Sequence, residues 1–260
     1  MQFFSYLING ISLGSVYALI ALGYTMVYGI AKMLNFAHGD VIMIGSYVVY
    51  FAFGASGLNP VLSIVLSMIV CTILGVVIER LAYRPLREAP SLAVLITAIG
   101  VSYLLQQVAQ LSWSSNPKSF TSVVSGMKPV SLFGGQLTIS AETIVTIVAC
   151  VVIMVVLMWF VNYTPAGHAM LAVSEDRGAA QLMGVNVNGT ISLTFAIGSA
   201  LAAIAGALLC SSYPTLQPTT GAMPGIKAFV AAVFGGIGSI PGAFVGGILL
   251  GIIENLSKAY

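Results

Sequence analysis

Long apolar stretches with few or no charges constrain the fold of this chain more than any other feature. They cover residues 5–28, 40–57, 60–79, 91–112, 143–162, 191–212 and 226–253. A hydrocarbon core about 30 Å thick is crossed by about 20 helical residues. The stretches are continuous and do not alternate with a period of two, which favours helices over a membrane barrel. We therefore predict an all-α, polytopic transmembrane bundle with about seven crossings, forming a single domain over residues 1–260.

The composition agrees with lipid as the solvent of this chain. Only 6% of the residues are charged, whereas soluble domains carry about 25%. The formal net charge is +2 and no run of Lys and Arg forms a basic patch, which argues against nucleic-acid binding. The cysteines Cys71, Cys150 and Cys210 lie far apart in apolar runs, so we interpret them as packing residues and predict no metal site.

The last apolar stretch is interrupted by helix-breaking residues. Its breakers are Gly235, Gly236, Gly238 and Pro241. Glycine weakens a helix, and proline removes a backbone donor and clashes with the preceding turn. In lipid, a broken backbone is tolerated only against protein or a water-filled cavity. We predict a half-helix or re-entrant piece at 225–238, followed by a full span from about residue 240.

Arginines in one short connection predict the orientation. Residues 79–88 contain three arginines, and such loops lie preferentially in the cytoplasm. Counting crossings from there places the N-terminus outside, the segment 113–141 outside, and the segment 163–190 inside. The outer segment is rich in Ser, Gly and Pro, and either a short hairpin or a plain loop fits it.

Polar residues cluster between the first two apolar stretches, at Lys32–Asp40. An ordinary cytoplasmic turn and a functional element that dips into the bundle both fit this cluster. In the second case each charge near the membrane midplane would cost about 2.5–3.5 kcal/mol or more and would require a partner or a role. His38 could titrate, but no relay of carboxylates runs through the spans, which argues against a proton pump.

The inner segment contains a second candidate element. We place Ser174 at the N-cap of a short helix, with Glu175 and Asp176 in its first turn, where the helix dipole favours negative charge. Gly184 is expected to end that helix. An exposed docking element for a partner and a helical loop packed on its own bundle remain equally open.

Small residues recur every four positions in the last two spans. The rows are Gly238, Gly242 and Gly246; Gly247 and Gly251; and Gly198, Ala202 and Gly206. This spacing lets helix backbones approach closely, so we favour a packing role over lining of a translocation path. No Walker-type glycine loop, Gly-x-Ser-x-Gly elbow or His-Glu-x-x-His motif is present in the sequence, so we predict neither an enzyme nor a cofactor.

Three motifs in this order resemble the permeases of branched-chain amino acid ABC transporters, specifically the shorter of the two paired permease subunits. They are Asn35-Phe36-Ala37-His38-Gly39-Asp40, the Glu175-Asp176…Ala179-Ala180…Gly184 loop, and Gly235-Gly236-Ile237-Gly238-Ser239-Ile240-Pro241-Gly242-Ala243. The resemblance implies a bacterial inner-membrane protein with four kinds of neighbour. These are a second homologous permease, two cytoplasmic ATP-binding subunits, a periplasmic solute-binding protein and the lipid bilayer.

The resemblance also implies roles for individual residues. The ATPase-coupling set is Glu175, Asp176, Arg177, Ala179, Ala180 and Gly184. The expected translocation path is formed by the two broken segments, at Asn35, Phe36, His38, Gly39, Asp40, Gly236, Gly238, Ser239 and Pro241. The family usually has basic residues before the acidic pair, where this chain has His168 and Leu171, and it continues into one more apolar span, whereas this chain stops at Tyr260.

Other functions remain open at the level of the sequence. Related permeases share these motifs, so urea or another small polar solute is an alternative cargo. A secondary transporter or channel is a second alternative. It should carry ionisable residues buried in mid-span, whereas Asp40, Glu79 and Glu142 lie near the ends of the predicted stretches. A membrane-embedded structural subunit is a third.

Overall fold

The computed structural model describes residues 2–124, 126–127, 129–132 and 137–259. Within these residues the long helices are α1 (Gln2–Ala31), α3 (Pro60–Ile78), α4 (Ser91–Trp113), α5 (Ala141–Tyr163), α8 (Val187–Ser212) and α10 (Ile240–Ala259). The shorter helices are α2 (His38–Val49), α6 (Pro165–Glu175), α7 (Arg177–Leu182) and α9 (Ala222–Phe234). Two π-helical turns, Tyr50–Ala55 and Glu79–Tyr83, extend α2 and α3, and a 3-10 turn follows at Arg84–Leu86.

The predicted transmembrane helical bundle is confirmed, and the structure refines its spans. Among the residues that the structure describes, six helices are long and apolar enough to cross a membrane, namely α1, α3, α4, α5, α8 and α10. The predicted stretch 40–57 is instead the short helix α2 with its π-helical turn. The stretch 226–253 is divided as predicted into a half-helix, α9, and a span, α10, that begins at residue 240.

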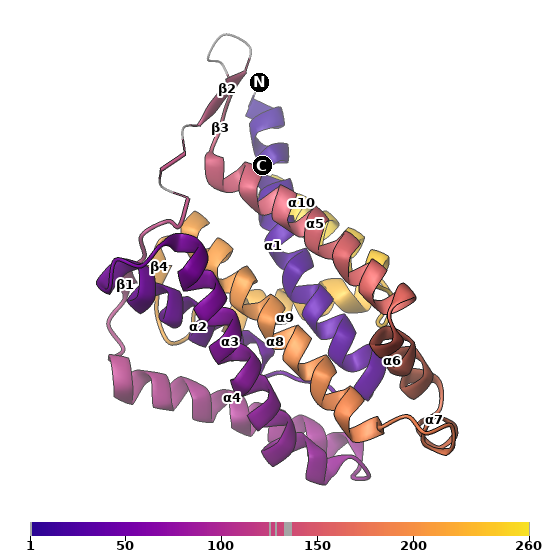
Figure 1. Cartoon of the computed structure of the whole chain (residues 1–260). Helices are drawn as coiled ribbons and strands as arrows, with labels where there is room; N and C mark the ends of the chain where they lie inside the picture. Colours follow the sequence, from indigo (N-terminus) through magenta and orange to yellow (C-terminus); the bar gives the residue numbers. More distant parts are fainter. Residues whose placement is uncertain (1, 125, 128, 133–136, 260) are drawn as a thin grey trace.

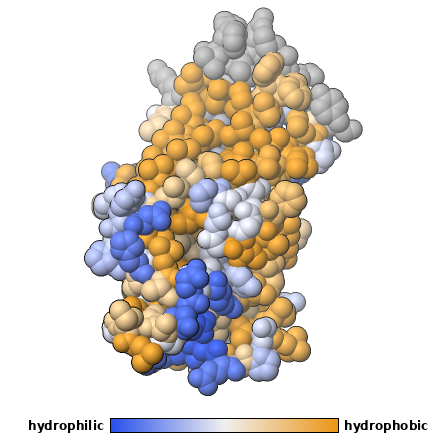
Figure 2. Space-filling view, turned by 90° about the vertical axis from the view of Figure 1, so that its right-hand side faces the viewer, coloured by the Kyte–Doolittle hydropathy of each residue, from blue (hydrophilic) through white to orange (hydrophobic). Residues whose placement is uncertain are grey.

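Helix α1 lies at the centre of the bundle (Figure 1). In its most apolar window 94% of the residues are buried, compared with 17% in α4 and 22% in α5. Helices α3 and α5 are more apolar than α1 and yet less buried, because lipid solvates apolar side chains as well as a protein interior does. The outer helices leave apolar side chains exposed over much of the surface, as lipid requires (Figure 2).

Small residues allow close helix contacts, as their spacing predicts. A Cβ atom on Gly251 would lie 2.2 Å from the Cα of Gly14, and one on Gly247 would lie 2.4 Å from the Cα of Ala18. Helix α10 therefore packs backbone to backbone along α1. A Cβ on Gly206 of α8 would similarly lie 2.6 Å from the carbonyl oxygen of Ile42 in α2. The packing interpretation is confirmed at these positions.

The two ends of the bundle differ. The N-terminal end of α1 and a β-hairpin of β2 (Val130–Leu132) and β3 (Leu137–Ile139) lie at one end, and α7 lies at the other (Figure 1). Of the two alternatives for the segment 113–141, a short hairpin or a plain loop, the structure therefore shows the hairpin. Residues 125, 128 and 133–136 of this segment lie outside the described part. Strand β1 (Lys118–Ser119) pairs antiparallel with β4 (Thr215–Leu216). We call the end that carries α6 and α7 the α7 end. Hydrophilic residues gather towards the bottom of the molecule in Figure 2.

Candidate functional site

The chain re-enters the bundle after α1. Lys32 adopts a left-handed backbone with φ 54°, which is uncommon for a residue other than glycine and turns the chain back on itself. Asn35 is buried and its side-chain oxygen accepts a hydrogen bond of 2.8 Å from the hydroxyl of Tyr83, which is also buried. The polar cluster is therefore an inserted element and not a solvated turn.

His38 lies against the C-terminal half of α1. Its ring packs on Tyr24 with a centroid separation of 4.7 Å. A Cβ atom on Gly23 would lie 2.4 Å from its Nε2 atom, so only glycine leaves room for this ring. Phe36 packs on Phe229 of α9, with ring centroids 5.3 Å apart. The first residues of α2 are thus surrounded by α1 and α9.

Gly39 brings the N-terminal ends of α2 and α9 together. A Cβ on Gly39 would lie 2.6 Å from the carbonyl oxygen of Gly221, and one on Gly221 would lie 1.8 Å from the carbonyl oxygen of Gly39. Two helices therefore begin next to each other inside the bundle. Broken helices that meet in this way are a recurring feature of membrane transport proteins.

Asp40 is buried although it lies near the end of its predicted stretch. Its side chain accepts a hydrogen bond of 2.9 Å from the amide of Gln106 in α4, and only 1% of the residue is exposed. No cation pairs with Asp40 among the residues that the structure describes. A carboxylate without a cationic partner inside a membrane protein is costly.

The second broken segment is a glycine turn between α9 and α10. Gly236 and Gly238 have φ angles of +89° and +99°, which only glycine adopts without strain. The Ser239 hydroxyl accepts a hydrogen bond of 3.2 Å from the Gly242 amide and so caps α10. Gly236, Gly238 and Ser239 are exposed, and so is Pro241 in the first turn of α10.

The two broken segments meet at one small cavity. Asn35 from the first segment and Ile237 from the second line it, together with Tyr24, Tyr28 and Phe229. The structure thus brings the two predicted path segments together through Asn35 and Ile237. It does not place Gly236, Gly238, Ser239 or Pro241 in the cavity wall.

The predicted coupling helix begins later than expected. Asp176, and not Ser174, is its N-cap, because the Asp176 carboxylate accepts hydrogen bonds from the amides of Gly178 (2.7 Å) and Ala179 (3.0 Å). Ser174 belongs to the preceding helix α6, which extends to Glu175. Gly184, with φ +85°, follows the end of α7 as predicted.

The exposed face of α7 is not centred on the predicted alanine pair. Ala180 is only 4% exposed and packs into the hydrophobic core. Glu175, Asp176, Ala179 and Gly184 are exposed. Leu182 and Met183, which sequence reasoning missed, are 90% and 84% exposed. The sequence feature that could have revealed them is a pair of large apolar residues just before Gly184.

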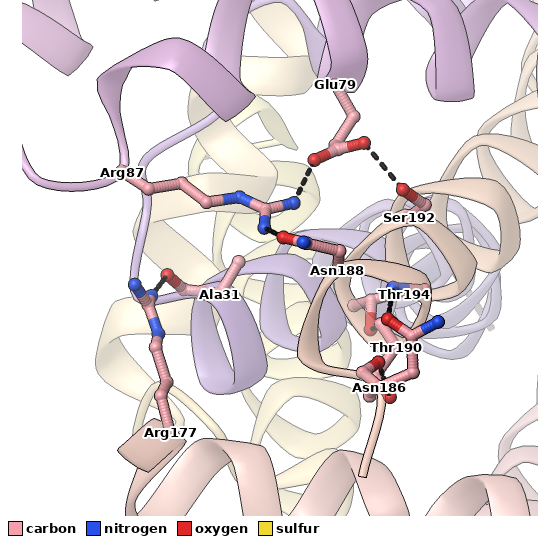
Figure 3. A network of polar contacts seen from close by, with 10 residues as sticks. Ala31, Glu79, Arg87, Arg177, Asn186, Asn188, Thr190, Ser192 and Thr194 are labelled. Atoms are coloured by element: carbon pink, nitrogen blue, oxygen red, sulfur yellow. Dashed lines mark hydrogen bonds and ion pairs between the residues drawn. The ribbon is translucent and has the colours of Figure 1, made fainter. Parts of the chain in front are cut away.

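Polar contacts connect α7 and the arginine-containing turn to the rest of the bundle (Figure 3). The Arg177 guanidinium donates to the backbone oxygen of Ala31, the last residue of α1. Arg87 donates to the Glu79 carboxylate and to the side-chain oxygen of Asn188. These contacts join segments that are far apart in the sequence.

Glu79 completes this network. Its carboxylate is fully buried and also accepts a hydrogen bond of 2.6 Å from Ser192 of α8. The arginine turn therefore holds the end of α3 against the start of α8. Sequence reasoning used Arg87 only for orientation and treated Glu79 only as a charge near a helix end. The sequence feature that could have revealed the role of Glu79 is its position as a single acidic residue at the end of an apolar stretch.

A larger cavity lies at the end opposite α7. Its volume is about 530 Å³, and its wall includes Asn9 and Ser12 of α1, Glu142 of α5, and Tyr213 after α8. Glu142 accepts a hydrogen bond of 3.0 Å from Ser122. This polar opening stands in contrast to the closely packed glycine contacts deeper in the bundle.

Comparisons with known proteins show the family of this chain. Residues 6–260 match the family model described as the branched-chain amino acid transport system / permease component. The chain is 44% identical to the high-affinity branched-chain amino acid transport system permease proteins LivH of Escherichia coli K12 and of Salmonella typhimurium, over 100% of this chain and 87% of each relative. It is 46% identical to the corresponding protein BraD of Pseudomonas aeruginosa, over 95% of this chain and 84% of the relative.

No solved structure shows significant similarity to this chain. The family match spans both broken segments and α7 as well as the six long helices. The chain therefore belongs to the family of permease components of branched-chain amino acid transport systems.

Proposed function

We propose that this chain is the permease subunit of an ABC importer that moves leucine, isoleucine and valine across the bacterial inner membrane. The observation that carries the proposal is the 44–46% identity, over nearly the whole chain, to relatives named for high-affinity transport of these amino acids. The sequence has no Walker-type loop, so separate cytoplasmic subunits hydrolyse ATP. A second homologous permease and a periplasmic solute-binding protein complete the complex.

The α7 end faces the cytoplasm in this proposal, and the N-terminus lies outside. The support is the arginine content of residues 79–88. The contact of Arg87 with Asn188 places this connection beside the segment 163–190. Both segments therefore lie on one side of the membrane, where the ATP-binding subunits are found.

Helix α7 is the contact with the ATPase. Leu182 and Met183 supply an apolar tip that a groove can enclose, and Glu175, Asp176, Ala179 and Gly184 surround it. Ala180 anchors the helix on its own bundle. The contact of Arg177 with Ala31 then links a movement of α7 to the turn that starts at Lys32.

The broken segments 35–40 and 235–242 gate the path. Supporting this, Asn35 and Ile237 line one cavity, and Gly39 lets α2 and α9 begin side by side. Movement of the end of α1 would shift the first segment against the second. Such rigid-body gating changes access from one side of the membrane to the other.

Uptake of radiolabelled leucine, isoleucine and valine by the complete complex in proteoliposomes tests the cargo. We expect saturable, ATP-dependent uptake that needs the binding protein and that unlabelled valine inhibits. Urea or ribose should not inhibit. Transport of urea in place of leucine, or uptake without ATP, would contradict the proposal.

The double substitution Leu182→Glu/Met183→Glu tests the contact. We expect co-purification of the ATP-binding subunits to fall about tenfold or more, because two charges would enter an apolar contact. Met127→Glu is the control, since Met127 is 63% exposed and belongs to the segment placed outside. Equal ATPase recovery in the two variants would show that α7 does not form the contact.

A further inference from the structure

A cavity at the α7 end gathers three cationic side chains. Its volume is about 370 Å³, and its wall includes Lys32 after α1, Arg87 of the arginine turn and Arg177 of α7. These residues come from three separate segments of the chain. No carboxylate belongs to the wall among the residues that the structure describes.

The positive charge in this cavity is only partly neutralised. Glu79 pairs with Arg87, and no carboxylate of the described residues pairs with Lys32 or Arg177. Three cations and one carboxylate leave a local net charge of +2. The Nε–H of Arg87 is buried and has no acceptor among the described residues. Burial and the neighbouring Arg87 guanidinium lower the pKa of Arg177. An anion would relieve both the repulsion and the missing acceptor.

Apart from Ser91, the rest of the wall is mainly apolar. Met33 and Val94 are buried in it, and Tyr28 and Leu34 are partly buried. Val94 belongs to the first turns of α4, the helix with the smallest buried share. The site therefore combines cations at the end of the bundle with an apolar wall next to the lipid-exposed helix. A phospholipid combines the two matching features, a charged phosphate group and apolar chains.

We propose that this cavity binds the phosphate group of an anionic phospholipid, which bridges α7, the end of α1 and the start of α4. Guanidinium groups match phosphate oxygens in geometry and charge. Basic pockets between transmembrane helices on the cytoplasmic side bind anionic headgroups. A bound lipid would hold the Arg177 guanidinium beside the end of α1, where α7 contacts it.

Native mass spectrometry of the complete, delipidated complex tests this site. Phosphatidylglycerol and phosphatidylcholine are titrated in parallel, and inorganic phosphate is titrated separately. We expect one phosphatidylglycerol to be retained in preference to phosphatidylcholine. Lys32→Gln and Arg177→Gln should each lower that preference about fivefold, as expected for loss of one charge near a headgroup. Lys32 is exposed, so its substitution leaves the fold intact.

Arg80→Gln is the matched control, because Arg80 is exposed, belongs to the same connection and does not line the cavity. The Arg80→Gln complex should prefer phosphatidylglycerol over phosphatidylcholine as strongly as the unmodified complex does. Val94→Trp should also abolish retention, by filling the cavity without changing its charge. Equal losses in Arg80→Gln and Lys32→Gln, or no headgroup preference, would overturn the proposal. Binding of inorganic phosphate that blocks phosphatidylglycerol would identify a free anion as the occupant instead.

The measurement concerns lipid retention and not transport. Failure of leucine uptake would therefore contradict the proposed function and leave the lipid site standing, and failure of lipid retention would do the reverse.

Discussion

The buried pair of Glu79 and Arg87 provides the sharpest test of the packing at the α7 end. The Glu79 carboxylate is fully buried, and 12% of the Arg87 side chain is exposed. Arg87→Met keeps a shorter, unbranched apolar stem and removes the guanidinium charge, which leaves the Glu79 carboxylate without its cation. Breaking a buried pair by removing one partner costs about 3–5 kcal/mol. Because Ser192 still donates to Glu79, we expect a loss near the lower limit.

The expected losses differ between the two partners. Glu79→Gln removes the buried charge and leaves Arg87 with Asn188 and a small solvent-exposed area, so about 1–3 kcal/mol is expected. The double substitution removes both charges and should cost less than the two single changes together by at least about 1 kcal/mol. For a chain of this size, 1 kcal/mol corresponds to about 2–4 °C in the melting temperature.

The assay is thermal unfolding of the purified chain in detergent, followed by intrinsic fluorescence. Arg87→Met should melt about 6–12 °C lower than the unmodified chain. Arg84→Met is the control, because Arg84 is exposed and makes no ion pair among the described residues. Losses that add in the double variant within about 0.5 kcal/mol would refute the coupling of Glu79 and Arg87.

Two further substitutions test the interior of the bundle. Gly251→Val should prevent the contact of α10 with Gly14 and abolish a stable fold, measured as loss of monodisperse protein. Gly54→Ala is the control and should be tolerated, because a Cβ at Gly54 meets nothing within 4 Å. Equal behaviour of the two variants would contradict the contact between α10 and Gly14. Asp40→Leu should leave the Gln106 amide with only its longer, 3.4 Å hydrogen bond to Ser102 and cost about 1 kcal/mol, measured by thermal unfolding, whereas Asp40→Asn keeps an acceptor and should cost less than half as much. Equal losses in both Asp40 variants would show that the hydrogen bond is not the cause.

Local signals predicted α9 and α10 well and α7 less well. The break between α9 and α10 was predictable because Gly236 and Gly238 take positive φ angles, which residues other than glycine adopt only with strain. The sequence prediction placed the start of α7 too early, because Ser174 belongs to a separate helix, α6, whose N-cap is Thr164. Its hydroxyl accepts a hydrogen bond from the Gly167 amide, and Pro165 fits the first helical position.

Hydropathy and glycine placement by themselves determined that this chain is a helical membrane bundle and determined where most helices begin and end. These properties depend on neighbours along the chain and on the solvent around each stretch. Only the tertiary structure decided that Arg177 reaches Ala31 and that Asp40 lies inside the bundle. It also decided that Ala180 faces inward and Leu182 outward. Such pairings depend on how closely helices approach, which is a property of two surfaces in contact and not of either sequence segment alone.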